Sequence, residues 1–597
     1  MLTPKGSSVL FNVIPIAASV WLLAVSPLPA ERARPADSAA AEREFRRGLA
    51  ALHDFEYEEA NDAFTRARTL DTGLAPAYWG EAMTYHQSLW GHEDLEAGRR
   101  ALARLGPTPA ARAARCRSRL EADLLGAVEI LFGRGDPASR RRNYADAMAR
   151  VFAEHSDDPD TAAFYALAVL GTMSRSLVGS DAHEGRSEGL AGSDAQARVA
   201  AILERVLQSH PDHRGALHYL LHTYDDPLHA RQGLAAARAY AKIAAGSSHA
   251  LHMPAHIFLQ LGMWPDAAAS DRAAFAASDA QVVRKHLGSA MRNYHALEWL
   301  HYELLQLGRY REAQNTIDEI EPTVKASGNL TLLSDLASMR ARYAIETRQW
   351  RLMGREQNFA NVNDLFAIGL SAARTGNAAL ADKARGVLAT RTEAVEEGAL
   401  RPAIAIMARE LAAIAALGAG RRDEATSILR GAAAAEMALP PPLGLPAPIK
   451  PAPELLGEVL LELGRPGEAI QWFERTLERS ANRSLSILGL ARALAAVGRT
   501  GDAHRRYREL LANFEHADAD LPEVNEARAA LQTLAPTAAP ADRMRSRLLA
   551  FALGVAAAAI GAVLIVRRRR KHHEKKRPAP VKGAGPKAAT KRKRQKR

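Results

Sequence analysis

The sequence predicts an all-α protein, a superhelical solenoid of stacked helical hairpins followed by a C-terminal transmembrane helix. A Gly is followed five residues later by an Ala at six places in the middle of the chain. Of the 597 residues, 47% are apolar but only 6% are aromatic, which favours close helix packing through small and aliphatic side chains. Near the C-terminus, 19 consecutive residues carry no charge, enough for a helix to cross a bilayer.

The N-terminal segment, residues 1–30, has the pattern of a secretory signal. Lys5 precedes an apolar stretch from Val9 to Val25, and SPLPA ends at Ala30. Leu28 is a poor residue two positions before that cleavage point, so we expect either a signal peptide or an uncleaved signal anchor. Both outcomes place the bulk of the chain outside the cytoplasm.

The Gly and Ala motif marks the turns of helical hairpins. Its copies are Gly262/Ala267, Gly308/Ala313, Gly376/Ala381, Gly420/Ala425, Gly464/Ala469 and Gly498/Ala503, the last two being 34 residues apart. Residues 11, 8, 7 and 4 before the turn Gly form one helical stripe, for example Ile487, Leu490, Ala491 and Leu494. The Gly ends the first helix, and the Ala packs the second helix against it. Such hairpins cover their apolar faces only by stacking on their neighbours.

These segments resemble the tetratricopeptide repeat family. The resemblance is carried by LGEVLLELGRPGEAIQWFERTL from Leu456, by GLARALAAVGRTGDAHRRYREL from Gly489, and by FEYEEANDAFTRARTLD and APAYWGEAMTY from Phe55 and Ala75. The exported part also resembles bacterial members of that family with no assigned activity. The resemblance implies a solenoid whose first helices line a concave groove that takes a protein or peptide.

We expect one α-solenoid of about a dozen hairpins over residues 31–534. It comprises N-terminal repeats over 41–104, His-rich repeats over 201–330 and C-terminal repeats over 366–534. The Pro-rich segment from Pro440 to Pro453 is predicted to be a connection and not a helix.

The C-terminal segment predicts membrane anchoring. A stalk linker over 535–547 leads to an apolar transmembrane helix over 548–566 and a disordered basic tail over 567–597. The positive-inside rule places this tail in the cytoplasm and the bulk of the chain outside it, in the periplasm if the protein lies in the inner membrane of a Gram-negative bacterium. Attraction of the tail to anionic lipid fits its place behind the span.

Charge and cysteine content exclude several function classes. The net charge is +12, but the tail alone carries +15, which leaves −3 for the remaining 566 residues, so we expect no nucleic-acid binding by the folded body. Cys116 is the single cysteine, which rules out an internal disulfide and a cysteine-based zinc site. The sequence contains no nucleotide-binding loop and no Gly-flanked nucleophilic serine, and we assign no catalytic residue.

Histidines gather in the middle of the chain, where nine of the 20 lie between His218 and His301. His249, His252 and His256 form a stripe roughly 130° from the packing stripe of their helix, by about 100° per residue, so we expect them outside the core. The preceding helix has the same register if its turn lies near Leu228. The three first helices present these candidate ligands: His218, His222, Asp225, His249, His252, His256, His295 and Glu298.

Two i, i+4 pairs, His218 with His222 and His252 with His256, suit chelation of a divalent ion, completed by a neighbouring helix as a zinc or copper site. Neither pair is an HExxH motif. The alternative is a polar groove whose imidazoles hydrogen-bond backbone or peptide ligands. A metal site would require the imidazoles to converge within about 4 to 5 Å.

Other polar and aromatic residues receive separate predictions. Pro254 is tolerable only if its helix starts near His252, which places His249 in the preceding loop. His301 lies on the packing stripe and is expected in the core, whereas His53 looks isolated and solvated. Candidate groove contacts are Trp79 and His86, if a turn lies near Leu89, together with Tyr302.

Two functions follow from these patterns. The first is a membrane-anchored scaffold that binds a protein or peptide partner in its groove outside the cytoplasm. The alternative is a metal-binding protein or metal-dependent enzyme that uses the histidine and carboxylate cluster, with zinc or copper as the ion.

Overall fold

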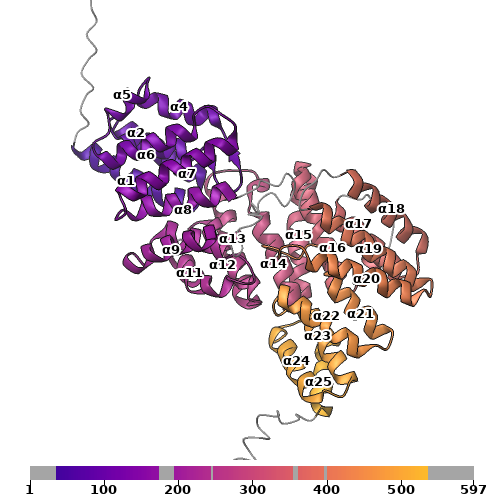
Figure 1. The fold of residues 1–597 in the computed structure, drawn as a ribbon. Helices are drawn as coiled ribbons and strands as arrows, with labels where there is room; N and C mark the ends of the chain where they lie inside the picture. The colour runs from indigo at the N-terminus through magenta and orange to yellow at the C-terminus, as the bar shows by residue number, and fades with distance from the viewer. Residues whose placement is uncertain (1–34, 174–193, 244–245, 354–360, 395–399, 535–597) are drawn as a thin grey trace, which may run out of the picture. The chain divides into compact units, whose positions relative to one another are not determined.

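The structure is a computed structural model that describes residues 35–173, 194–243, 246–353, 361–394 and 400–534 (Figure 1). The predicted signal segment, stalk linker, membrane helix and basic tail lie outside the described residues. Within the described part, no helix is both long enough and apolar enough to cross a bilayer.

The described residues are almost entirely helical. The first elements are α1 (Pro35–His53), α2 (Tyr57–Leu70), α3 (Ala75–Met83), β1 (His86–Gln87), β2 (His92–Glu93), α4 (Leu95–Leu105), α5 (Pro109–Ala113), α6 (Arg119–Leu131), α7 (Pro137–Glu154), α8 (Pro159–Met173), α9 (Asp194–Ser209), α10 (Arg214–Tyr224), α11 (Ala230–Ile243), α12 (Ser248–Gln260) and α13 (Trp264–Arg284). The later elements are η1 (Ser289–Met291), α14 (Tyr294–Gln306), α15 (Tyr310–Ser327), α16 (Leu330–Glu346), η2 (Trp350–Leu352), α17 (Val362–Arg374), α18 (Ala378–Ala394), α19 (Leu400–Gly418), α20 (Arg422–Met437), α21 (Ala452–Glu462), α22 (Pro466–Arg479), α23 (Ser484–Ala496), α24 (Thr500–Asn513) and α25 (Pro522–Thr533).

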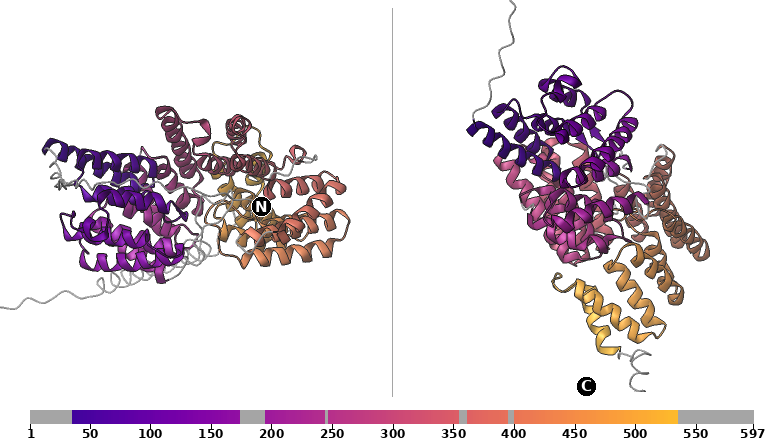
Figure 2. Two further views of the ribbon diagram at one scale, coloured as in Figure 1. Left: turned by 90° about the horizontal axis from the view of Figure 1, so that it is seen from above. Right: turned by 60° about the vertical axis from the view of Figure 1, so that its left-hand side comes forward.

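The chain divides into two compact units, each with its own packing. Unit 1 comprises the chain up to Leu300, with Asp318–Leu336 and Pro440–Leu445, and unit 2 comprises His301–Ile317, Ala337–Leu439 and the chain from Pro446. Within each unit, consecutive helices pack as hairpins, such as α12 with α13 and α19 with α20 (Figure 2). First helices of successive hairpins also touch, as α10 and α12 do in unit 1 and α21 and α23 do in unit 2. This confirms the predicted repeat of helical hairpins.

The turn glycines adopt the predicted conformation at all six positions. The φ angles are 65° at Gly262, 68° at Gly308, 82° at Gly376, 79° at Gly420, 71° at Gly464 and 77° at Gly498. A residue with a Cβ rarely adopts such angles, which explains the glycine at each turn. The six paired alanines are all buried.

The packing stripe is also confirmed. Ile487, Leu490, Ala491 and Leu494 of α23 are buried in the core of unit 2. A Cβ added to Gly457 of α21 would lie 2.8 Å from the Phe473 ring, so a small residue there lets α21 and α22 approach.

The N-terminal repeats depart from the prediction near Leu89. There is no helical turn at this point, because α3 ends at Met83 and a short antiparallel pair follows, with His86 opposite Glu93. His86 therefore lies on a strand, and its predicted helical register with Trp79 is wrong. The Pro-rich connection is confirmed between α20 and α21, although Ala452 and Pro453 already belong to the first turn of α21.

The start of α12 also differs from the prediction. The helix begins at Ser248, so His249 lies in its first turn and Pro254 lies inside it. The Ser247 side chain caps the helix by accepting a hydrogen bond from the Ala250 N–H at 3.1 Å. Burial of Ala250, Met253 and Ala255 stabilises the helix, which outweighs the backbone hydrogen bond that proline cannot donate.

Candidate metal centre

Six histidines from three helices of unit 1 lie together. They form two triads: His218, His222 and His249 are the first, and His252, His256 and His295 are the second. In each triad the candidate ligand atoms all lie within 4.8 Å of one another. Helix α10 supplies one i, i+4 pair and α12 the other. The predicted convergence across adjacent helices is therefore found, but as two groups and not one.

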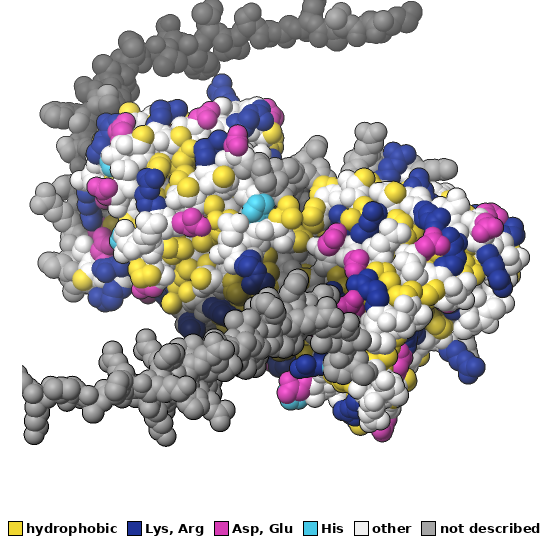
Figure 3. Space-filling view, turned by 60° about the horizontal axis from the view of Figure 1, so that its bottom comes forward, with side chains coloured by type: hydrophobic (Ala, Val, Ile, Leu, Met, Phe, Trp, Pro, Cys, Tyr) yellow, Lys and Arg dark blue, Asp and Glu magenta, His cyan; other side chains and the backbone are white. Residues whose placement is uncertain are grey.

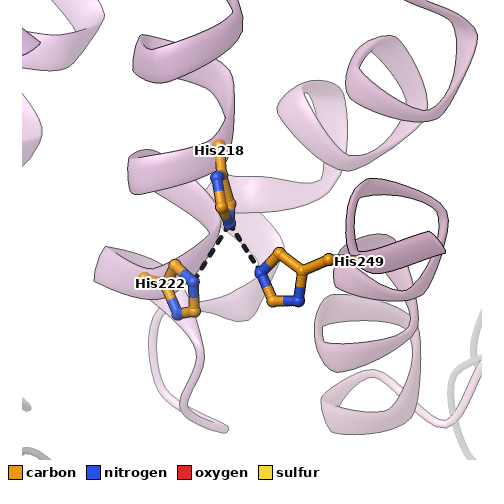
Figure 4. Close-up of side chains that lie close together, drawn as sticks. All are labelled: His218, His222 and His249. Carbon is orange, nitrogen blue, oxygen red and sulfur yellow. Dashed lines mark hydrogen bonds between the residues drawn. The ribbon is translucent and has the colours of Figure 1, made fainter. Parts of the chain in front are cut away.

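In the first triad, the side chains converge on His218 (Figure 4). Its Nε2 lies 3.1 Å from Nε2 of His222 and 3.1 Å from Nε2 of His249. Its Nδ1 lies 2.6 Å from the backbone oxygen of His53. Because a carbonyl oxygen can only accept, Nδ1 carries the proton, and in the neutral ring Nε2 presents a lone pair to the other two imidazoles.

The second triad has carboxylate partners behind its imidazoles. Nδ1 of His252 donates to Asp271, and Nδ1 of His256 donates to Asp225 at 2.7 Å. Nε2 of His252 and Nε2 of His256 lie only 3.0 Å apart. The His295 ring centroid is 4.7 Å from that of His252. Since ionised carboxylates only accept, both Nδ1 atoms are protonated, and in neutral rings the two Nε2 lone pairs face each other.

Burial disfavours the charged form of these imidazoles. The residues His218, His252 and His256 are 0%, 2% and 5% exposed, and His222, His249 and His295 are half-buried. Burial, and then the neighbouring imidazoles, lower the pKa values of His218, His222, His249 and His252 well below the usual value. Neutral imidazoles are the form that binds metals.

The prediction that this stripe lies outside the core is wrong, because aromatic side chains cover it. The distance between ring centroids is 4.4 Å for Phe55 and His218, 5.4 Å for Trp90 and His249, and 4.4 Å for Trp299 and His256. Phe55 and Trp90 come from N-terminal loops far away in sequence. Little histidine reaches the surface on the face drawn in Figure 3.

The two predicted carboxylate ligands lie in different places. Asp225 stands behind His256 as a hydrogen-bond acceptor, and Gln260 donates to it at 3.4 Å and to the Pro442 backbone oxygen at 3.0 Å. Glu298 of α14 is half-buried and belongs to neither triad. Asp225 therefore orients a ligand and is not one itself.

Sequence reasoning missed Asp271. It lies on α13, four residues after Ala267, on the buried stripe that continues to Ala274 and Ser278. The sequence could have indicated it, because Asp271 is a carboxylate at a packing position of the second helix in its hairpin. A buried charge needs a partner on the facing helix. The facing residue is His252.

His53 is buried and not solvated, contrary to the prediction. Its Nε2 lies 2.8 Å from Asp160 and its Nδ1 2.9 Å from the Tyr219 hydroxyl, while His213 reaches Asp160 at 3.1 Å. Burial raises the pKa of Asp160, but the hydrogen bonds from His213 and His53 lower this pKa by a larger amount. The net shift is therefore downward. The ring partners fix His53, whose backbone oxygen orients His218.

The candidate groove contacts are buried as well. Trp79 packs edge-on against Phe164, and burial lowers the pKa of His86 to about 3. The Tyr302 hydroxyl accepts a hydrogen bond from Arg483 at 3.1 Å in unit 2. These side chains therefore do not line an open groove. His301 is a core residue as predicted, with its Nδ1 donating to the Ala313 backbone oxygen at 3.0 Å.

The donor sets suit a transition metal. Each triad offers three imidazole nitrogens, the ligand type that zinc and copper accept. In His218, His252 and His256 the other ring nitrogen is held by a carbonyl or carboxylate, which fixes the tautomer that presents Nε2 to an ion.

Comparison with known proteins gives limited similarity. No family model and no curated protein matches the chain. A tetratricopeptide repeat protein from Parabacteroides merdae is 17% identical, with 48% of this chain and 97% of that chain covered and a TM-score of 0.27. Yeast Tom70 is 9% identical, with 80% and 92% covered and a TM-score of 0.27. The Cut9 and Hcn1 complex of APC/C gives 13% identity, 83% and 96% coverage and a TM-score of 0.27.

Such low TM-scores carry no argument about the site or its ligand, so the fold assignment rests on the chain's own geometry. The hairpins, the positive φ of their turn glycines and the buried alanines are those that the sequence resemblance implies. The fold of this chain is of the tetratricopeptide repeat type.

Proposed function

We propose that this protein binds transition-metal ions, zinc or copper, at its two histidine triads. The observation that supports this most is the 3.0 Å separation between Nε2 of His252 and Nε2 of His256, whose Nδ1 atoms both donate to carboxylates. Two lone pairs at that distance repel each other. A cation bound between them turns the repulsion into coordination.

The alternative without a metal is a proton on one of the two rings. That proton would create an imidazolium in a site that aromatic rings surround. Burial lowers the pKa of His252 well below its usual value, so a charged ring is unfavourable near neutral pH. A divalent metal ion carries a larger charge but gains several coordinate bonds, which offset its desolvation.

A carboxylate that accepts a hydrogen bond from a ligating histidine is the arrangement expected of a resident metal site. Outer partners that orient ligating imidazoles typically contribute about 10–100-fold in affinity. Asp225 and Asp271 supply such partners in the second triad, and the His53 backbone oxygen supplies one in the first.

We further propose that the metal-binding domain lies outside the cytoplasm, held by the segment over residues 548–566. The sequence of this segment and the basic tail behind it support that topology. A phosphatase that is active only outside the cytoplasm, fused after Leu534, should be active in a bacterial host, and the same reporter fused after Arg597 should be inactive. Equal activity of both fusions would contradict the anchor.

The experiment for metal binding is elemental analysis of the purified full-length chain. We expect close to stoichiometric zinc or copper in the wild type and loss of ions in the double variant His222→Ala with His256→Ala. The matched control is His210→Ala, because His210 is exposed and belongs to neither triad. Absence of bound metal, with no uptake when zinc or copper is added, would contradict the proposal and favour a membrane-anchored scaffold for a protein or peptide partner.

A further inference from the structure

Resting on the proposed function, we infer that the two triads form one binuclear metal centre and not two independent sites. Consecutive turns of α12 supply His249 to the first triad and His252 to the second. The centroid of the His222 ring lies 6.2 Å from the ring centroid of His249 in its own triad and 6.4 Å from that of His256 in the other triad. The separation between rings of different triads is therefore only slightly larger than one within a triad.

This proximity places one ion at each triad close enough to share a small bridging ligand. In two-metal sites the ions typically lie about 3.5–4 Å apart. The ring of His252 also lies near both His256 and His295, at centroid distances of 4.8 and 4.7 Å, so the second triad closes around its ion from two helices. The same is true of the first triad, where His249 of α12 meets the pair on α10.

Copper(II) suits a test of this arrangement, because both triads offer imidazole nitrogens only and copper accepts such ligands. The two carboxylates hydrogen-bonded to the ligands, Asp225 and Asp271, already accept from Nδ1 atoms. The imidazole nitrogens therefore remain as the ligands for both ions.

Access to the centre is provided by the less buried histidines. His222, His249 and His295 are half-buried, so each triad has at least one ligand residue that is partly exposed, whereas His218 and His252 are buried. Ions and a small bridging ligand would enter from that side. The deeper histidines keep their orientation through the His53 backbone oxygen and Asp271.

Electron paramagnetic resonance of the full chain loaded with copper(II) tests this inference. We expect two copper ions per wild-type chain and loss of most of their signal, because a bridged copper(II) pair couples its unpaired electrons. His295→Ala should retain the first triad alone and His249→Ala the second alone, so that each variant binds one ion with its full signal. The exposed His210→Ala control should behave as the wild type does.

Two copper ions with full signal in the wild type, and a spectrum equal to the sum of those of the two variants, would overturn the binuclear centre and leave metal binding intact. Failure to bind any metal would instead refute the proposed function, so the two failures are distinguishable.

Discussion

The buried cations Arg483 and Lys450 of unit 2 pair with carboxylates, whereas buried histidines of unit 1 face other imidazoles. Arg483, which is 0% exposed, donates to Glu454 at 2.8 Å and to Glu346 at 2.6 Å. Lys450 donates to Glu454 at 2.7 Å and to Glu458 at 2.9 Å. Each cation in this network meets carboxylates.

In unit 1 a carbonyl or carboxylate oxygen accepts from Nδ1 of His218, His252 and His256, whereas Nε2 of each lies against another imidazole. The difference separates two uses of buried polar groups. A network whose donors meet acceptors contributes to the folded state by itself. The facing Nε2 atoms of His252 and His256 are the contact from which we infer a bound ion.

The largest effect should come from breaking the unit 2 network. Arg483→Met leaves Glu346 buried without its cation and Glu454 with Lys450 alone, so we expect the free energy of unfolding to fall by about 3–5 kcal/mol. Urea denaturation of the metal-free protein measures this. In contrast, His256→Gln removes a lone pair from a repulsive contact and should cost far less. Equal losses for the two variants would remove the distinction between the clusters.

The next effect is stabilisation by metal. If ions bind the triads only in the folded state, a ligand at 100 times its dissociation constant should raise the free energy of unfolding by about 2.7 kcal/mol. Thermal unfolding with and without copper measures this rise, which should disappear in the double variant His222→Ala with His256→Ala. An equal rise in that variant would place the metal elsewhere on the chain.

Acid should destabilise the metal-free protein through the histidines. Because folding lowers the pKa values of His218, His222, His249 and His252, the unfolded chain binds more protons below about pH 6.5. Stability is present above that pH and is lost as the pH falls below it, by about 1.4 kcal/mol per pH unit for each proton taken up. Denaturation between pH 7 and pH 5 should show this slope, and it should be shallower in His252→Gln. No dependence on pH would contradict neutral triads.

Loss of an outer partner should weaken metal binding without abolishing it. Asp225→Asn keeps the shape of the side chain but removes the charge that orients His256, so we expect affinity to fall by about 10–100-fold. Competition with a chelator measures the change. A matched change at the exposed Asp157 should have no effect. Unchanged affinity in Asp225→Asn would show that the carboxylate has no part in the site.

The smallest effect is expected at Glu298, which the sequence suggested as a ligand. Since it belongs to neither triad, Glu298→Gln should retain the metal stoichiometry of the wild type. Loss of one ion in this variant, measured by elemental analysis, would add Glu298 to the donor set.

The fold was predictable because its determinants are local. The spacing from Gly262 to Ala267, and its copies, specifies a turn and a close helix contact within a few residues. The short strand pair containing His86 was not predictable in this way, because its pairing with Glu93 interrupts an otherwise helical pattern.

The candidate site was predictable only in part. Helical register brought His218, His222, His252, His256 and His295 to the same region, and the structure places them together. Register could not show that the cluster divides into two triads, nor that Phe55 and Trp90 bury it, because those contacts join segments far apart in sequence. The contact between the His53 backbone oxygen and His218 could not be predicted, because a backbone atom leaves no pattern in the sequence of side chains.

The most direct test of the metal centre is anomalous diffraction from crystals of the protein at the zinc and copper absorption edges. We expect one peak at each triad, with the Nε2 atoms of His252 and His256 both about 2.0–2.1 Å from the same ion. Ordered histidines with no anomalous peak in either triad, in crystals grown with both metals present, would contradict it.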